Sequence, residues 1–80
     1  MKIETLFFGI TTDLVNTSSM VVEVDRILNI AEFKIFLKDK FPQLENINSY
    51  AVAVNEAYAT DDVVLKENDT VAIIPPVSGG

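Results

Sequence analysis

Hydrophobic and polar positions alternate at the start of the chain, over residues 2–9. A period of two is that of a β-strand, whose successive side chains point to opposite faces. The face that carries Lys2 and Glu4 prefers water, so the opposite face should line the core. A second alternating run over 20–24 is predicted to form a strand that pairs with the first. The residues expected to face the core from the first strand are Ile3, Thr5 and Phe7, while in the second Met20, Val22 and Val24 alternate with Val21 and Glu23.

Residues 30–41 carry the one clear helical pattern. Apolar side chains recur there at spacings of three and four, which places them on a single stripe. Asn29 is a suitable N-cap, Glu32 stands three residues later as in a capping box, and Pro42 ends the helix. The buried stripe of this helix should comprise Ile30, Phe33, Phe36, Leu37 and Phe41.

Two further strands are predicted after the helix, over residues 50–54 and 70–74, with a short edge strand at Tyr58 and Ala59 between them. Residues 10–18, earlier in the chain, are a polar connection with room for a helical turn. The order of two strands, one helix and two or three strands predicts an α+β fold with the last strand beside the first. We therefore expect a β-grasp, or ubiquitin-like, roll: a mixed sheet of four to five strands with one main helix on one face.

Composition removes several classes of function. The chain of 80 residues has the length of one small domain, and it contains no Cys and no His, which excludes thiol nucleophiles, His-based triads and zinc–thiolate sites. Its net charge of −6 argues against a nucleic-acid partner. No apolar run approaches the ~18 residues of a membrane span, and the acidic start at Glu4 is unlike a signal peptide. We expect a cytoplasmic protein with no membrane partner.

Side-chain catalysis is not expected either, because the carboxylates are scattered along the chain. Asp61 and Asp62 are neighbours whose side chains should diverge, so a solvated turn explains them better than a metal site. The residues from Glu67 to Asp69 are predicted to form a further turn before the last strand. The chain is therefore predicted to have no active site of its own, no metal and no bound cofactor.

The last six residues, Pro75-Pro76-Val77-Ser78-Gly79-Gly80, are predicted to form an extended tail after a domain at 1–74. Two prolines end strand pairing and favour an extended path. Gly79 and Gly80 have no side chain, so they can enter a narrow channel in a partner. The reactive group is then the Gly80 carboxylate, which needs an activating enzyme to become an acyl donor such as an acyl-adenylate. A frayed tail without function is the alternative.

An apolar patch is expected at the root of this tail. Leu6 and Phe8 lie on the water-facing side of the first strand, and Ile74 lies on the outward face of the last strand. One helix covers only one sheet face, so these side chains should stay exposed and mark a partner interface. The alternative is that a loop or the small segment near residues 58–65 covers them.

These residues resemble the small subunit of molybdopterin synthase, a ubiquitin-like sulfur carrier, over essentially the whole chain. The most specific match is Val71-Ala72 followed by the Pro-Pro-Val-Ser-Gly-Gly ending. Leu6-Phe7-Phe8 and Ala53-Val54-Asn55 also match. The family commonly has an Asp-Gly-Asp turn before the last strand, where Asn68 here tolerates the left-handed geometry. It commonly has aromatic residues at positions 73 and 74, which are Ile in this chain.

The resemblance implies a sulfur-transfer cycle. A ubiquitin-activating-like adenylyltransferase adenylates Gly80, and a sulfur source converts the acyl-adenylate to a thiocarboxylate. The tail then enters the active site of the large synthase subunit and passes sulfur to a cyclic pyranopterin monophosphate, which builds the dithiolene of molybdopterin. Two large subunits would form a central dimer with one small subunit at each end. The resemblance assigns threading of the tail to Pro75, Pro76, Val77, Ser78 and Gly79, and its seating on the partner to Phe8 and Ile74, beside Leu6.

Three alternatives remain open from the sequence. The chain can be a sulfur carrier for thiazole synthesis or another thiolation pathway, although thiazole carriers are usually shorter and lack the Pro-Pro-Val-Ser run. It can be a ubiquitin-like modifier that joins Gly80 to a lysine of another protein. It can also be a plain interaction module whose tail has no role.

Overall fold

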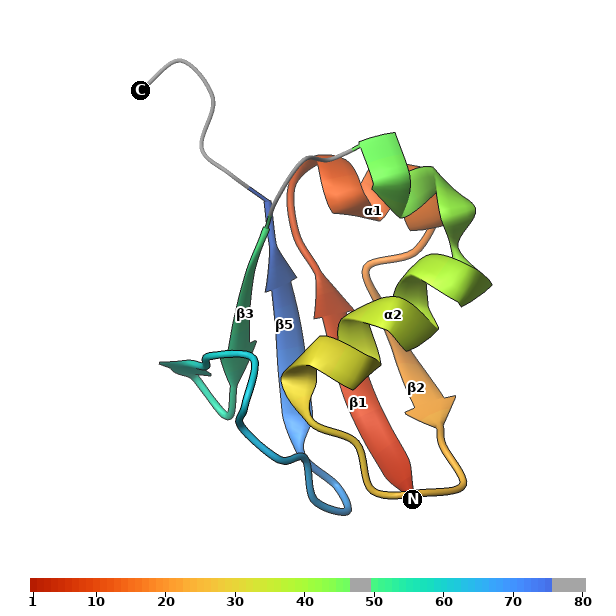
Figure 1. The fold of residues 1–80 in the computed structure, drawn as a ribbon. Coiled ribbons are helices and arrows are strands. Elements are labelled where there is room, and N and C mark those ends of the chain that lie inside the picture. The colour runs from red at the N-terminus through yellow and green to blue at the C-terminus, as the bar shows by residue number, and fades with distance from the viewer. Residues whose placement is uncertain (47–49, 76–80) are drawn as a thin grey trace.

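The computed structural model describes residues 1–46 and 50–75, which form the expected α+β roll (Figure 1). A five-stranded mixed sheet in the order β2-β1-β5-β3-β4 packs one face against α2. The strands are β1 (Lys2–Phe7), β2 (Ser19–Glu23), β3 (Ala51–Val54), β4 (Ala57–Tyr58) and β5 (Thr70–Ile74), and the helices are α1 (Ile10–Val15), α2 (Ile30–Lys40) and the 3-10 helix η1 (Pro42–Asn46). The β-grasp prediction is confirmed.

The last strand lies in the middle of the sheet, beside the first. β1 and β5 run parallel, with Leu6 opposite Ala72 and Phe7 opposite Ile73. β1 also pairs antiparallel with β2, and β5 pairs antiparallel with β3. β5 is therefore hydrogen-bonded on both sides, and its neighbours β1 and β3 fix the position of its C-terminal end.

The core lies between α2 and the sheet and matches most of the predicted inward positions. The predicted inward residues of β1, which are Ile3, Thr5 and Phe7, are all buried. Of the predicted helix stripe, Ile30, Phe33 and Leu37 are fully buried, while Phe36 and Phe41 pack against the core from partly exposed positions. The rings of Phe41 and Phe7 meet edge to face at a centroid distance of 6.1 Å, which joins the end of the helix to β1.

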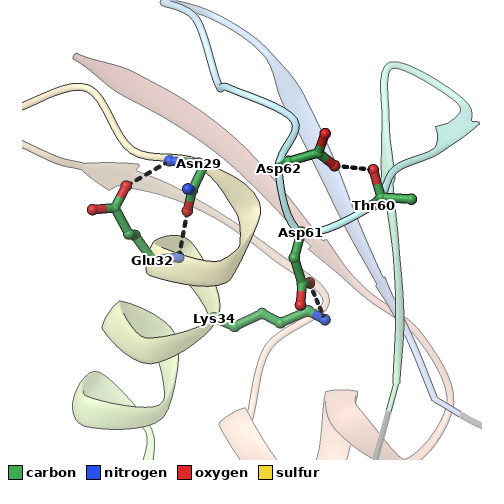
Figure 2. Close-up of polar contacts among 6 residues, drawn as sticks. All are labelled: Asn29, Glu32, Lys34, Thr60, Asp61 and Asp62. Atoms are coloured by element: carbon green, nitrogen blue, oxygen red, sulfur yellow. Dashed lines mark hydrogen bonds and ion pairs between the residues drawn. The ribbon is translucent and has the colours of Figure 1, made fainter.

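The start of α2 is built as the sequence predicts. The Asn29 side chain accepts a hydrogen bond of 2.8 Å from the Glu32 amide, and the Glu32 carboxylate accepts one of 2.9 Å from the Asn29 amide (Figure 2). This reciprocal capping box satisfies two of the donors that a helix start leaves unpaired. The chain after α2 continues as η1, where Leu44 is buried in the core. The sequence analysis did not predict this element.

The segment that follows β4 lies against the start of α2. The amides of Ile30 and Ala31 donate hydrogen bonds to the carbonyls of Val63 and Asp61, at 2.9 and 3.1 Å. The segment therefore packs on the helix side of the molecule. The alternative in which it covers the apolar patch is wrong, since Phe8 remains 48% exposed.

Asp61 and Asp62 diverge, as predicted for neighbours in a turn. The Asp61 carboxylate pairs with the Lys34 ammonium at 2.9 Å, whereas Asp62 accepts a hydrogen bond from the Thr60 hydroxyl (Figure 2). The Thr60 hydroxyl lowers the pKa of Asp62, since it stabilises the ionised carboxylate. Lys34 also lies over the ring of Tyr50, whose pKa is raised by burial and secondarily by Asp61. These contacts join the segment to α2 and account for both aspartates structurally.

Left-handed residues form the turns beside β3 and β5. Asn55 and Glu56 have φ values of 50° and 72° and make a two-residue hairpin loop, for which positive φ at both positions is the favoured geometry. Asn68 has a φ of 69°, so Asn adopts the left-handed geometry expected of that turn. The Asn55 side chain accepts a hydrogen bond from the Thr70 amide and donates one to Asp69, each 3.0 Å long, and this links the two turns.

Candidate partner-binding surface

The structure describes four of the predicted site residues: Leu6, Phe8, Ile74 and Pro75. Phe8 is 48% exposed, and the other three are partly exposed. The tail roles given to Pro76, Val77, Ser78, Gly79 and Gly80 fall outside the described residues. The division into a domain at 1–74 and a tail at 75–80 stays a prediction.

Strand pairing brings a row of side chains together on the sheet face that points away from α2. Leu6 stands opposite Ala72, and Ala72 stands opposite Ala53. Ala53 in turn stands opposite Tyr58, so the row crosses four strands. The buried core residue Ile73 follows Ala72 in β5, which places the row on the opposite face of the sheet. The side chains of the two alanines are small, so the middle of this row projects less from the sheet than Leu6 and Tyr58 at its ends.

A second row lies next to the first, at the end of β5 from which the tail leaves. Ala51 stands opposite Ile74 in the pairing of β3 with β5. On the other side, the Phe8 amide donates a 3.3 Å hydrogen bond to the Ile73 carbonyl, which carries the register of β1 one residue past its end. The two rows together form a surface that we call the open-face patch, made of Leu6, Phe8, Ala51, Ala53, Tyr58, Ala72 and Ile74, of which Ala53 is buried beneath its neighbours and the others are partly or fully exposed. It begins directly at the root of the tail.

Sequence reasoning missed Tyr58 and the three alanines of the open-face patch, and Tyr58 is the one large side chain among them. Its side chain is 77% exposed, and an exposed aromatic residue in a row of apolar side chains is typical of an interaction surface. The sequence reading placed Tyr58 in a short edge strand but assigned it to no face. The two-residue loop at Asn55 and Glu56 was the available signal, because the length of a hairpin loop sets which residues pair across it.

The corner between β1 and α1 is held by a buried threonine at the tail end of the sheet. Thr11 is fully buried, and its hydroxyl accepts a 3.0 Å hydrogen bond from the Phe8 amide and donates one to the Phe8 carbonyl. Gly9, between them, has a φ of 56°, and a Cβ placed there would lie 3.0 Å from Cγ of Pro75. Pro75 therefore packs directly on the Gly9 backbone. The strand ends at Phe7 rather than at Gly9 as predicted, because the chain turns at this corner into α1.

Charged groups border the open-face patch without forming a metal-binding cluster in the part of the chain that the structure describes. The Glu4 carboxylate accepts a 3.3 Å hydrogen bond from the Thr70 hydroxyl at one margin. No three acidic side chains among residues 1–46 and 50–75 gather closely enough to hold a metal ion. Within the same residues, no helix has the length and apolar character needed to cross a membrane. The patch is suited to binding another surface.

A groove of about 630 Å³ lies elsewhere on the molecule, between α2 and the connection that precedes it. Leu28 and Phe36 contribute apolar atoms to its lining, with Arg26 and Lys38 among its charged residues. None of its lining residues belongs to the open-face patch. The groove is therefore separate from the surface at the root of the tail.

Known proteins resemble this chain over nearly all of its length. The sequence matches the ThiS family over residues 5–80. The molybdopterin synthase sulfur carrier subunit of Drosophila melanogaster is 35% identical over 83 aligned residues, which cover 100% of this chain and 92% of the relative. The protein of the same name from Arabidopsis thaliana is 52% identical over 42 residues, which are 51% of this chain and 44% of the relative, so this alignment spans less than half of that protein.

Solved structures share the fold at lower sequence identity. SAMP1, the small archaeal modifier protein 1, from Haloferax volcanii superposes with a TM-score of 0.85 at 22% identity, and the match covers 100% of both chains. A chain of the complex of subunits 1 and 2 of the molybdopterin-converting factor from Helicobacter pylori superposes with a TM-score of 0.70 at 24% identity, also over 100% of both chains. The match over residues 5–80 and the full-length Drosophila relative show that this chain belongs to the ThiS family.

Proposed function

We propose that this chain is the sulfur-carrying small subunit of a molybdopterin synthase. The observation that carries the proposal is the match along the whole chain to sulfur carrier subunits of that enzyme, from a family whose match extends to the last residue, Gly80. The position of β5 supports it. This strand is held on both sides in the sheet, and it ends beside an exposed apolar patch.

The proposed chemistry takes place at the Gly80 carboxylate. A carboxylate oxygen attacks the α-phosphorus of ATP, pyrophosphate leaves, and an acyl-adenylate results. Hydrosulfide then attacks the acyl carbon, the C–O bond breaks with AMP as the leaving group, and loss of the S–H proton gives the thiocarboxylate. A ubiquitin-activating-like adenylyltransferase, which binds ATP and the tail together, supplies the first step. Sulfur travels as a covalent modification of the chain, which then needs no bound cofactor.

The proposed receiving partner is the large subunit of the synthase. The charged tail enters its active site, where the thiocarboxylate sulfur forms a C–S bond to a cyclic pyranopterin monophosphate. Water then cleaves the acyl–sulfur bond and returns the Gly80 carboxylate, and two such deliveries form molybdopterin. The open-face patch binds the surface around that active site. The Helicobacter pylori structure, which contains subunits 1 and 2 of the molybdopterin-converting factor together, supports a complex of this kind. In this complex the small subunit is a sulfur donor and holds no catalytic side chain.

Mass spectrometry of the intact chain tests the proposal. The chain is incubated with the adenylyltransferase, ATP and a sulfur donor, and the expected product is heavier by the replacement of one oxygen by sulfur. A chain that lacks Gly80 should show no such product. A chain with Ile35→Ala, changed on the exposed side of α2, is the matched control and should be modified normally. The absence of a thiocarboxylate, with an enzyme that modifies its own known carrier, would contradict the proposal.

A protein modifier is the second candidate, because SAMP1 has the same fold over the full length of both chains. In that function a lysine amine attacks the Gly80 acyl-adenylate and an isopeptide bond forms. Slower-migrating conjugates that contain this chain and disappear when Gly80 is removed would favour the modifier. Transfer of sulfur to the pterin precursor by the purified large subunit would favour the carrier.

A further inference from the structure

The surface at the root of the tail does not end with the sheet. Phe8 and Ile10 stand on either side of Gly9, and their side chains are 48% and 56% exposed. Pro75 packs on the backbone of Gly9 between them. Figure 1 shows α1, which begins at Ile10, at the same end of the sheet as the end of β5. Exposed apolar side chains therefore come from the residue that follows β1 and from the first residue of α1, on either side of the Gly9 backbone that Pro75 contacts.

The length of chain after Pro75 limits where a partner can stand. Five residues follow Pro75, and five residues span at most about 17 Å when fully extended. A partner that reacts with the Gly80 carboxylate must place its reacting atoms within that distance of Pro75. If those atoms lie inside an active site, the rim of the site must come against the residues that surround Pro75. Ile10 directly follows Gly9, the residue on whose backbone Pro75 packs.

The corner that carries Ile10 is held in place before any partner arrives. The Thr11 and Thr12 hydroxyls bond to the carbonyls of Phe8 and Phe7. The amides of Thr11 and Thr12 donate to the carbonyls of Phe8 and Gly9, each at 3.1 Å. A surface that is already ordered loses little conformational entropy on binding, so its apolar contacts translate into affinity.

We propose that Ile10 is a second contact of the large synthase subunit, on α1 and outside the open-face patch. The partner then contacts the root of the tail on two sides, through Phe8 on the sheet side and Ile10 on the helix side. The inference rests on the proposed function, because it takes the large subunit as the occupant. The surface of the large subunit that contacts Ile10 is apolar: the rim of its active site presents a hydrophobic side chain or the flat face of an aromatic ring to Ile10.

A matched pair of isoleucines tests this inference. Ile35 lies on α2 and is 69% exposed, so it resembles Ile10 in type and exposure but lies away from the corner. The full-length chain and its Ile10→Ala and Ile35→Ala variants are titrated with the large subunit from the same genome by isothermal calorimetry. Ile10→Ala should weaken binding by about tenfold, the effect of losing one well-packed interface side chain. Ile35→Ala should leave the affinity within about twofold, and both variants should melt within a few degrees of the parent chain.

The outcomes separate the inference from the proposed function. If the parent chain binds the large subunit and Ile10→Ala binds equally well, the contact at Ile10 is wrong and the proposed function stands. If Ile35→Ala weakens binding as much as Ile10→Ala, the effect does not come from the tail root, and the inference also fails. If the parent chain itself does not bind the large subunit, the proposed function fails and takes the inference with it.

Discussion

Two buried threonines differ in whether their hydroxyls have a partner, and this difference predicts opposite mutational effects. Thr5 and Thr11 are both fully buried. The Thr5 hydroxyl faces the core from β1 and has no hydrogen-bond partner among the described residues. The Thr11 hydroxyl accepts from the Phe8 amide and donates to the Phe8 carbonyl. Replacement of each by Val keeps the shape of the side chain and removes only the hydroxyl.

The expected magnitudes follow from the cost of leaving polar groups unpaired. A buried hydroxyl without a hydrogen bond costs about 1–3 kcal/mol on mutational scales, so Thr5→Val should raise the free energy of unfolding by about 1 kcal/mol or more. Thr11→Val removes two hydrogen bonds. The Phe8 amide keeps the Ile73 carbonyl at 3.3 Å and the Phe8 carbonyl keeps the Thr11 amide at 3.1 Å. The loss should therefore be about 1–2 kcal/mol rather than the full cost of two unpaired groups.

Urea denaturation and thermal melting of the parent chain and both variants measure this difference. For a domain of this size, 1 kcal/mol moves the melting temperature by about 4–8 °C, so the two variants should differ by roughly 10 °C or more, on opposite sides of the parent. The double variant should show additive effects if the two sites do not share contacts. A Thr5→Val chain that is less stable than the parent would refute the reasoning, because the orphaned hydroxyl would then not be a cost to the fold.

Three further changes probe the cap, a turn and the surface. Asn29→Ala should lower the free energy of unfolding by about 1 kcal/mol, because it breaks the capping box of α2, and an unchanged urea midpoint would contradict that role. Glu56→Gly should raise it by about 0.5–1 kcal/mol, because Glu56 is held at a φ of 72°; a drop in melting temperature would show that the Glu side chain contributes more than the backbone strain. Phe8→Asp should leave the melting temperature nearly unchanged and weaken binding to the large subunit by more than tenfold, since Phe8 is 48% exposed; unfolding of this variant would place Phe8 in the core instead.

The sequence predicted the elements best where local signals agreed with one another. The bounds of β5 and the capping box at Asn29 were confirmed, because alternation, turn residues and cap residues there all indicate the same structure. The pairing of β5 with β1 was also predicted, although it rests on a non-local contact, because the element order permits few sheets. The short helix α1 was anticipated only as a possible turn. Four of its six residues have β-branched side chains, which have low helix propensity, and the tertiary contact of Thr11 decides its shape.

The candidate site was predicted in part. Leu6, Phe8 and Ile74 were assigned to an exposed patch from alternation alone, and the structure brings them together at the end of β5. The contribution of Tyr58 was missed, because it depends on the register of a two-stranded hairpin. The packing of Pro75 on Gly9 was missed as well, since residues 66 positions apart in the chain meet there and no local pattern records such a contact.

The character of the open-face patch suits a carrier that must leave its partner. A thiocarboxylate holds one sulfur atom, so under the proposed function each chain delivers once and must dissociate before it is charged again. Permanent complexes use large and strongly hydrophobic interfaces, which release their partners slowly. The patch has alanines at three of its seven positions, and only Phe8 and Tyr58 are aromatic. Two aromatic side chains beside small alanines provide specific recognition, while the interface stays weak enough for the chain to dissociate between deliveries. Under the proposed function, we expect the tail, rather than a deep hydrophobic interface, to determine which active site receives the sulfur.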